Sequence, residues 1–249
     1  MQLDFTDKRI LITGGSRGIG KQIADDLCSL GATVLITGTN PSEIEALNEA
    51  AAKTGQSKKF LTLDLLHTDS INQFLNEIKE YDRIDCLINN AGINRLNPIQ
   101  NAMVPDWEDM MKVNLTSPFL LLNAVSPIMI QNNFGRIVNI ASIFGVISKE
   151  KRAVYSATKF GIHGLTVGCS NDLARYNILV NTVSPGFVLT DLTRKNLTTS
   201  EIEELSKQIP IKRMAETRDI SSVVIFLLSD LNQYVTGQNI IVDGGFTNV

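Results

Sequence analysis

The hydrophobic positions of this chain alternate between two patterns. Apolar residues recur about every 3.6 positions in segments such as 23–30 and 71–78, a spacing typical of amphipathic helices. Between these segments lie short runs rich in β-branched residues, which predict strands at 9–13, 33–37, 59–63, 84–88, 136–140, 178–183 and 239–242. Seven strands separated by helices predict parallel pairing, because each parallel connection needs a crossover of this length.

Residues 10–12 and 86–88 are apolar without alternation, as expected where helices cover both faces of a parallel sheet. We therefore expect an α/β fold: a single doubly wound Rossmann domain over residues 1–249 with a seven-stranded parallel sheet. No linker, charge block or repeat divides the chain. Residues 186–210 break the pattern with a polar run rich in Thr and Asn, which predicts a substrate loop or lid at the carboxyl ends of the strands.

The charge balance argues against a nucleic-acid partner. Of the 249 residues, 43% are hydrophobic, and 23 basic against 26 acidic side chains leave a formal net charge of −3. The stretch between Lys112 and Arg136 carries no charge, but Asn and Pro residues interrupt it, so we expect a buried or interface helix and no membrane partner.

The cysteines favour a reducing compartment. Cys28, Cys86 and Cys169 form no CxxC pair, and the chain has only two histidines, so we expect reduced thiols and no metal site. The N-terminus has neither the basic nor the apolar region of a signal peptide, which predicts a cytoplasmic protein.

A glycine-rich turn, Thr-Gly-Gly-Ser-Arg-Gly-Ile-Gly at residues 13–20, joins the first strand to the first helix. Glycine lets the backbone approach a pyrophosphate closely, and the first turn of a helix offers free N–H groups to an anion. The turn therefore predicts a nucleotide site that includes Gly14, Gly18, Ile19 and Gly20. Its spacing is neither GxGxxG nor that of a P-loop, and tight packing alone is the alternative.

The end of the second strand bears on which nucleotide binds. Dinucleotide folds that prefer NAD usually carry a carboxylate there, but this chain has Thr37-Gly38-Thr39-Asn40, and the first carboxylate is Glu43. Arg17 is placed to pair with a 2′-phosphate, which favours NADP(H) over NAD(H). The alternative is that Arg17 faces solvent and that Asn40 only begins a helix.

Tyr155 and Lys159 are four residues apart, on one face of a predicted helix. A nearby ammonium stabilises a phenolate, so we expect Lys159 to lower the pKa of Tyr155 and to suit it for general acid–base catalysis. Such pairs are also common on helix surfaces. Ser142 directly follows the strand at 136–140, where its hydroxyl is placed to hold a carbonyl oxygen beside Tyr155.

Asn114 lies four residues before Pro118, which cannot donate the helical hydrogen bond to the carbonyl of residue 114. A water bound at that carbonyl would connect Lys159 to solvent and replenish the proton that Tyr155 transfers. A simple kink in a buried helix is the alternative.

These motifs, together with Asn89-Asn90-Ala91-Gly92 and Ser184-Pro185-Gly186, occur in the order of the short-chain dehydrogenase/reductases. The resemblance spans nearly the whole chain, which is most similar to the 3-oxoacyl-acyl-carrier-protein reductases. It implies hydride transfer between NADP(H) and a carbonyl or alcohol, with 3-oxoacyl thioesters among the expected substrates. By resemblance, Ser142 orients the substrate, Tyr155 transfers the proton, Lys159 also holds the nicotinamide ribose, and Asn114 takes part in the proton relay.

The same resemblance assigns the remaining contacts to the cofactor. They are Ser16, Arg17 and Thr39 at the phosphates and adenosine ribose, Asp64 and Leu65 at the adenine, Asn90, Ala91 and Gly92 along the cofactor, and Val188, after Pro185 and Gly186, at the nicotinamide amide. Members of the family commonly form homotetramers through two long helices, here 107–131 and 153–175. Gly161, Gly164 and Gly168 would permit close approach of the second helix.

The chain departs from the carrier-protein reductases where those carry basic residues for an acidic carrier. Asn133 and Tyr176 stand at these positions, with Arg136 and Arg175 as neighbours that would compensate. The basic cluster at 149–152 is either a solvated loop or an attractor for a small anionic or sugar-like substrate. Three functions remain: a ketone reductase, a sugar or polyol dehydrogenase, and a nucleotide-sensing module without catalysis.

Overall fold

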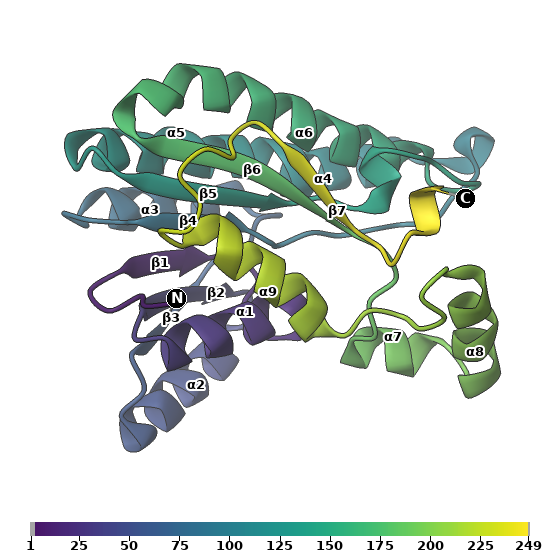
Figure 1. Ribbon diagram of the computed structural model, residues 1–249, viewed down its shortest axis with the longest axis horizontal. Helices are drawn as coiled ribbons and strands as arrows, with labels where there is room; N and C mark the ends of the chain where they lie inside the picture. Colours follow the sequence, from purple (N-terminus) through teal and green to yellow (C-terminus); the bar gives the residue numbers. More distant parts are fainter. Residues whose placement is uncertain (1–2, 249) are drawn as a thin grey trace.

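Seven parallel strands form one sheet in the order β3-β2-β1-β4-β5-β6-β7 (Figure 1). The computed structural model describes residues 3–248, apart from the side chains of Leu192 and Asn196. The strands are β1 (Arg9–Ile12), β2 (Thr33–Gly38), β3 (Lys58–Thr62), β4 (Cys86–Asn89), β5 (Gly135–Ile140), β6 (Ile178–Pro185) and β7 (Asn239–Val242). The predicted Rossmann fold and its seven strands are confirmed, with ends that differ by at most two residues.

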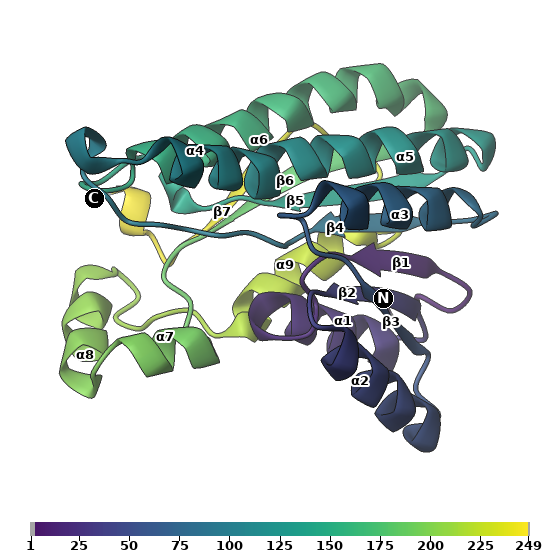
Figure 2. The same ribbon diagram turned by 180° about the vertical axis from the view of Figure 1, so that it is seen from behind.

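Helices cover both faces of the sheet (Figures 1 and 2). One face carries α1 (Gly18–Ser29), α2 (Pro41–Thr54) and α9 (Thr217–Leu228), and the other carries α3 (Thr68–Lys79), α4 (Val104–Met111), α5 (Ser117–Gln131) and α6 (Ala153–Leu173). Side chains of β1 alternate between the two cores, Ile10 and Ile12 on the α1 side and Leu11 on the α3 side. Short 3-10 turns are η1 (Ile99–Asn101), η3 (Ile143–Gly145), η4 (Ala174–Tyr176) and η5 (Phe246–Asn248).

A π-helical turn, η2 (Lys112–Thr116), joins α4 to α5. Pro118 lacks the N–H that an α-helix would use at this point, and the N–H of Ser117 bonds five residues back to the carbonyl of Lys112. The continuous stretch Val104–Gln131 is long and apolar enough to cross a membrane by length and composition. Half of its apolar 18-residue window is buried, and Val125 and Met129 pack in the core, as one of the two expectations, a buried or an interface helix, requires.

The segment 186–210 differs from the predicted loop. It folds into two short helices, α7 (Asp191–Asn196) and α8 (Thr199–Gln208), at the end of the molecule toward which the strands point (Figure 1). Threonine side chains cap the N-termini of both helices. The hydroxyl of Thr190 accepts the N–H of Thr193, and Thr198 forms a capping box with Glu201. The Thr-rich composition therefore marks helix starts, because a hydroxyl at the N-cap accepts a backbone N–H that would otherwise be unpaired.

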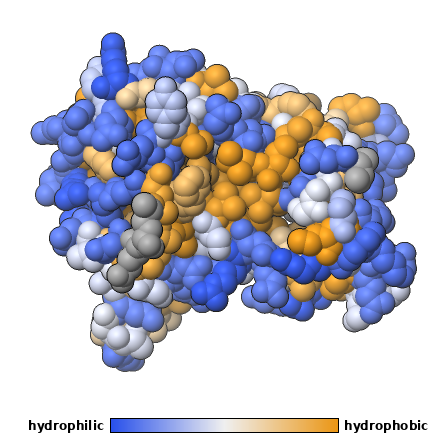
Figure 3. Space-filling model, in the orientation of Figure 1, coloured by the Kyte–Doolittle hydropathy of each residue, from blue (hydrophilic) through white to orange (hydrophobic). Residues whose placement is uncertain are grey.

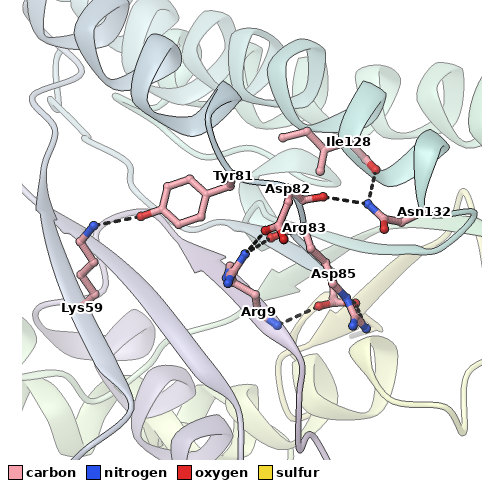
Figure 4. A network of polar contacts seen from close by, with 8 residues as sticks. All are labelled: Arg9, Lys59, Tyr81, Asp82, Arg83, Asp85, Ile128 and Asn132. Carbon is pink, nitrogen blue, oxygen red and sulfur yellow. Dashed lines mark hydrogen bonds and ion pairs between the residues drawn. The ribbon is translucent and has the colours of Figure 1, made fainter.

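A polar network stabilises the opposite end of the sheet, at the amino ends of the strands (Figure 4). The buried carboxylate of Asp85 accepts the backbone N–H of Arg9 at 2.8 Å and the Nε of Arg83 at 2.8 Å. The guanidinium of Arg9 bonds in turn to Asp82 at 2.7 Å. Asn132, just after α5, donates to the carbonyl of Asp82 at 3.2 Å. The network therefore joins β1, the segment before β4 and the end of α5, far from the carboxyl ends.

Candidate active site

The glycine turn after β1 is held by side chains from neighbouring strand ends. The Oγ1 of Thr13 accepts the N–H groups of Asn90 and Ala91 at 3.0 and 3.1 Å, and the Nδ2 of Asn90 donates to the carbonyls of Thr13 and Gly14 at 2.9 and 3.0 Å. Thr37 accepts the N–H of Gly14 at 3.2 Å. Gly14 has a φ of +62°, and a Cβ there would lie 3.0 Å from the Cα of Ala91, so only glycine fits this close approach.

The first turn of α1 fits a phosphate group. Arg17, at the N-cap, makes no capping hydrogen bond with its side chain, and the described first turn contains no acidic residue. The N–H groups there are therefore available to an anion. Beside them lies a cavity of about 330 Å³. It is lined by ten of the predicted cofactor residues: Gly14, Arg17, Gly18, Ile19, Thr39, Asp64, Leu65, Asn90, Ala91 and Gly92.

Two residues of the glycine turn that were predicted to bind the cofactor do not line this cavity. Gly20 packs the helix against the strand ends, since a Cβ there would lie 2.5 Å from the Nδ2 of Asn90. Ser16 lines a neighbouring crevice between α1 and α2. Asn40 caps α2 by accepting the N–H groups of Ser42 and Glu43, as the alternative interpretation of that position required.

A second, wider cleft of about 860 Å³ continues from the nucleotide cavity and shares Arg17, Asn90 and Gly92 with it. It contains six further predicted residues: Ser142, Tyr155, Lys159, Pro185, Gly186 and Val188. Three elements supply them, namely the end of β5, the first turns of α6 and the end of β6. Residues far apart in the sequence thus meet because the carboxyl ends of parallel strands share one edge of the sheet.

Burial shifts the pKa values of both Tyr155 and Lys159. Burial raises the pKa of Tyr155, while Ser142 and the guanidinium of Arg152 act to lower it. The ammonium of Lys159 lies 5.7 Å from the centre of the Tyr155 ring and donates to the carbonyl of Ile140 at 2.9 Å. Burial lowers the pKa of Lys159 to about 8. The expectation that Tyr155 has a lowered pKa is therefore wrong for the protein by itself, because burial outweighs the nearby charges.

Asn114 lies behind the cleft, and its side chain is fully engaged. The Oδ1 accepts the N–H of Ile93 at 2.8 Å, and the Nδ2 donates to the carbonyl of Ile93 at 2.9 Å and to the Oγ1 of Thr158 at 3.1 Å. Thr158 donates to the carbonyl of Tyr155 at 2.7 Å. Asn114 thus connects the chain after β4 to the helix that carries Tyr155, and its proton-relay role stays a prediction.

Sequence reasoning missed the polar side chains that hold this site together. Thr13 and Thr37 fix the glycine turn, as described above. A buried chain of hydrogen bonds also runs from Asn89 through Asn139 and Thr166 to Thr182, each link at 2.8 Å. The sequence does contain an indication of this network, because each of these polar residues stands within an otherwise apolar strand or helix. Buried polar groups need partners, and such positions therefore indicate a network.

Over the residues that the structure describes, no group of three His, Cys, Asp or Glu side chains is arranged to hold a metal ion. The three cysteines are free, with Cys86 buried and Cys28 and Cys169 partly buried.

A family model described as enoyl-(acyl carrier protein) reductase matches residues 14–247. The chain belongs to the short-chain dehydrogenase/reductase family. It is 41% identical to the 3-oxoacyl-acyl-carrier-protein reductase of Aquifex aeolicus, covering 98% of this chain and 99% of that one. It is 36% identical to the enzyme of the same name from Escherichia coli, covering 98% of each.

Solved structures of this family share the whole fold. A gluconate 5-dehydrogenase from Burkholderia cenocepacia, in complex with NADP and tartrate, superposes with a TM-score of 0.91 at 32% identity and covers 99% of this chain and 97% of its own. A putative gluconate dehydrogenase from Agrobacterium tumefaciens has a TM-score of 0.92 at 30% identity, with 100% of each chain covered. The predicted family and its oxidoreductase class are confirmed.

Proposed function

We propose that the protein reduces a ketone with NADPH, and that 3-oxoacyl thioesters are the first substrates to test. The observation that carries the proposal is the meeting of Ser142, Tyr155 and Lys159 in one cleft that continues into the nucleotide cavity. The curated relatives that are named as 3-oxoacyl-acyl-carrier-protein reductases over nearly their full length support the choice of substrate.

The residues of the cleft divide the work of reduction. NADPH, when bound, supplies a hydride to the carbonyl carbon. The hydroxyl of Tyr155 gives its proton to the carbonyl oxygen, and Ser142 donates a hydrogen bond to the same oxygen. The raised pKa of Tyr155 keeps the phenol protonated at neutral pH, which suits an acid that acts during reduction. Lys159 holds positive charge beside the phenol and stabilises the phenolate that remains after the transfer.

The preference for NADP(H) is supported by the end of β2. Thr39 and the exposed Arg17 line the nucleotide cavity there, and the adjoining residues Thr37 and Gly38 supply no carboxylate. A 2′-phosphate at this place would meet the cation of Arg17, and β2 itself ends without a carboxylate.

There is less support for a substrate that is attached to an acyl carrier protein. Arg136 is buried and donates to the carbonyls of Gly135 and Asn177 at 2.8 and 2.9 Å, so it does not compensate for Asn133 on the surface. Arg175 is exposed and lies over the Tyr176 ring. The second candidate is accordingly a sugar or polyol dehydrogenase, which the likeness to gluconate dehydrogenases favours.

We also propose a homotetramer. Exposed apolar side chains gather on two faces, and a tetramer built as a dimer of dimers needs two different interfaces. One face includes Phe119 of α5 and Phe160 of α6. The other includes Phe226 of α9 and Ile241 of β7, where Figure 3 shows apolar surface across the middle of the molecule. Gly164 and Gly168 face open space on α6, whereas Gly161 contacts Leu115 within the chain.

We further propose that the protein is cytoplasmic. The free cysteines support this location, because thiols stay reduced there.

We also propose that the single domain at 1–249 includes α7 and α8 as a lid over the cleft. Thr193, Leu197 and Leu205 of this segment line the cleft, and none of the described residues of α8 is buried, which supports a segment able to move.

The test follows the absorbance of NADPH with acetoacetyl thioesters, diketones and keto-sugars, and of NADP⁺ with polyols. We expect reduction of at least one ketone, with turnover lower by a factor of about 10² to 10⁴ in Tyr155→Phe while NADPH still binds. Tyr234→Phe, at a tyrosine that is 95% exposed, is the matched control. Binding of NADPH without turnover of any substrate would favour the nucleotide-sensing module, and polyol oxidation alone would favour the second candidate.

A further inference from the structure

Arg152 stands at the substrate end of the cleft, just before α6. Its guanidinium carbon lies 4.5 Å from the centre of the Phe144 ring, and that ring meets the Tyr155 ring edge-on at 6.5 Å between centres. Arg152 is the N-cap residue of α6, with a non-helical backbone, three residues before Tyr155. Lys159 follows Tyr155 by four residues on the same helix, so the two cations flank the proposed acid along the chain.

The charge of Arg152 has no anionic partner within the described chain. No ion pair or hydrogen bond of its guanidinium occurs among residues 3–248, although the side chain is half-buried and burial lowers its pKa. Arg95, which also lines the cleft, differs because it is paired: it bonds to Asp106 and Asp109 at 2.9 and 2.7 Å. Because partly buried charges are normally paired, an unpaired guanidinium inside a cleft points to an anion supplied by a ligand.

The other charged side chains that line the cleft are also cationic. Its described lining includes five cationic side chains and no Asp or Glu: Arg17, Arg95, Lys149, Arg152 and Lys159. Arg17 and Lys159 lie toward the nucleotide cavity, and Arg95 is already paired. Lys149 and Arg152 are therefore the cations left for the substrate, in a cleft whose walls concentrate their field.

We propose that Arg152 binds an anionic group of the substrate, a carboxylate or a phosphate, that lies close to the reacting carbon. The inference rests on the proposed reduction at Tyr155. Arg152 precedes Tyr155 by only three residues at the start of α6, and both side chains lie against the Phe144 ring, so we place the anion about two to four bonds from the carbonyl carbon. Oxo acids, keto-sugar acids and keto-sugar phosphates have this arrangement. A thioester has no charge at that position, and we therefore expect it to be the poorer substrate.

The experiment compares matched charged and neutral ketones in the full-length enzyme with NADPH. The carboxylate pair is acetoacetate and ethyl acetoacetate, and the phosphate pair is dihydroxyacetone phosphate and dihydroxyacetone. The measured quantity is the ratio of kcat/KM for the charged ketone to that for the neutral one. We expect a ratio well above one in the wild type for the pair that carries the correct anion, which distinguishes carboxylate from phosphate.

Three variants test the residue. Arg152→Gln should lower the ratio about 10-fold or more, because a hydrogen bond between charged groups is lost. Arg152→Lys, which keeps the charge, should restore part of it. Lys151→Gln removes the same charge from an exposed neighbour that does not line the cleft, and should leave the ratio unchanged. An unchanged ratio in Arg152→Gln, or a wild type that reduces the neutral ketones as well as the charged ones, would overturn the inference while leaving the proposed function in place.

A binding measurement keeps the inference testable if no ketone is reduced. Calorimetry with malonate and with inorganic phosphate, in the presence of NADPH, reports the anion site without turnover. Weaker binding of either anion by about 10-fold in Arg152→Gln, with Lys151→Gln unaffected, would support the site even if the proposed function failed. Equal binding by all variants, or no binding by the wild type, would overturn it.

Discussion

The ammonium of Lys159 donates a 2.9 Å hydrogen bond to the backbone carbonyl of Ile140, the last residue of β5. The bond holds the charge at the carboxyl end of the sheet, next to the ring of Tyr155. The acceptor is a neutral carbonyl and not a carboxylate, so it does little to stabilise the charged ammonium. Burial, which disfavours the charge, therefore lowers the pKa of Lys159 to about 8. The residue that supplies the positive charge of the site therefore titrates near physiological pH.

The first prediction concerns the pH dependence of reduction. Lys159 is charged below about pH 8 and loses its proton as the pH rises through that value. We expect kcat/KM for the ketone to be level at lower pH and to fall above about pH 8, because the phenolate of Tyr155 then lacks its stabilising cation. Rates measured from pH 6 to 9.5 test this, with circular dichroism as a control for folding. A rate that stays level to pH 9.5 would contradict it.

The second prediction concerns stability. The pKa of Lys159 lies below the 10.5 of the free side chain, so between about pH 8 and 10.5 the unfolded chain binds more protons than the folded one. This residue's contribution to the free energy of unfolding therefore rises with pH across that window. Relative to Lys159→Met, the wild type should gain up to about 3 kcal/mol between pH 7 and 10.5, measured by urea unfolding at each pH. A constant difference between the two proteins would refute this.

Cofactor choice should depend on Arg17 and Thr39. Replacing Arg17 with Gln removes the cation proposed to meet the 2′-phosphate, and we expect the Kd of NADPH to rise about 10- to 100-fold with little change for NADH. Thr39→Asp should raise the preference for NADH, because a carboxylate there accepts the ribose hydroxyls and repels the phosphate. Fluorescence titration with both nucleotides measures the effect. Lys21→Gln, one turn along α1 and outside the nucleotide cavity, is the control.

The network at the amino ends of the strands should affect stability and not catalysis. Asp85→Ala removes a buried carboxylate that accepts from Arg9 and Arg83, and we expect the free energy of unfolding to fall by about 2 to 3 kcal/mol. Asp82→Ala breaks an exposed ion pair and should cost less than about 1 kcal/mol. Turnover per folded molecule should match the wild type in both, since the network lies far from the cleft. Equal losses of stability would show that the burial of Asp85 does not matter.

The proposed assembly should depend on the exposed face of α6. Phe160→Glu places a charge on a residue that is 49% exposed in the single chain, and we expect it to reduce the tetramer to a smaller species in sedimentation velocity. Thr54→Glu, at the exposed end of α2, should leave the wild-type species intact. The prediction fails if the wild type is a monomer, or if Phe160→Glu sediments as the wild type does.

Local patterns were sufficient to predict the fold and most of the side chains that the structure brings together at the cleft. The apolar runs predicted all seven strands, since a parallel sheet covered on both faces is built mainly from apolar residues. The glycine turn and the Tyr155–Lys159 spacing predicted the two halves of the cleft, because both depend on residues close together in the sequence. The polar run within 186–210 predicted a loop or lid, but its threonines cap two short helices, because capping and loop formation favour the same residue types.

The sequence by itself determined which elements form, how they alternate and which side chains are expected to carry the chemistry. Only the tertiary structure decided how strongly those side chains are buried, and therefore that the pKa of Tyr155 is raised where a lowered value was expected. It also decided which cations have partners: Arg136 is buried among backbone carbonyls, whereas Arg152 faces the cleft unpaired. Burial and pairing depend on segments that are distant in the chain, and no local pattern records them.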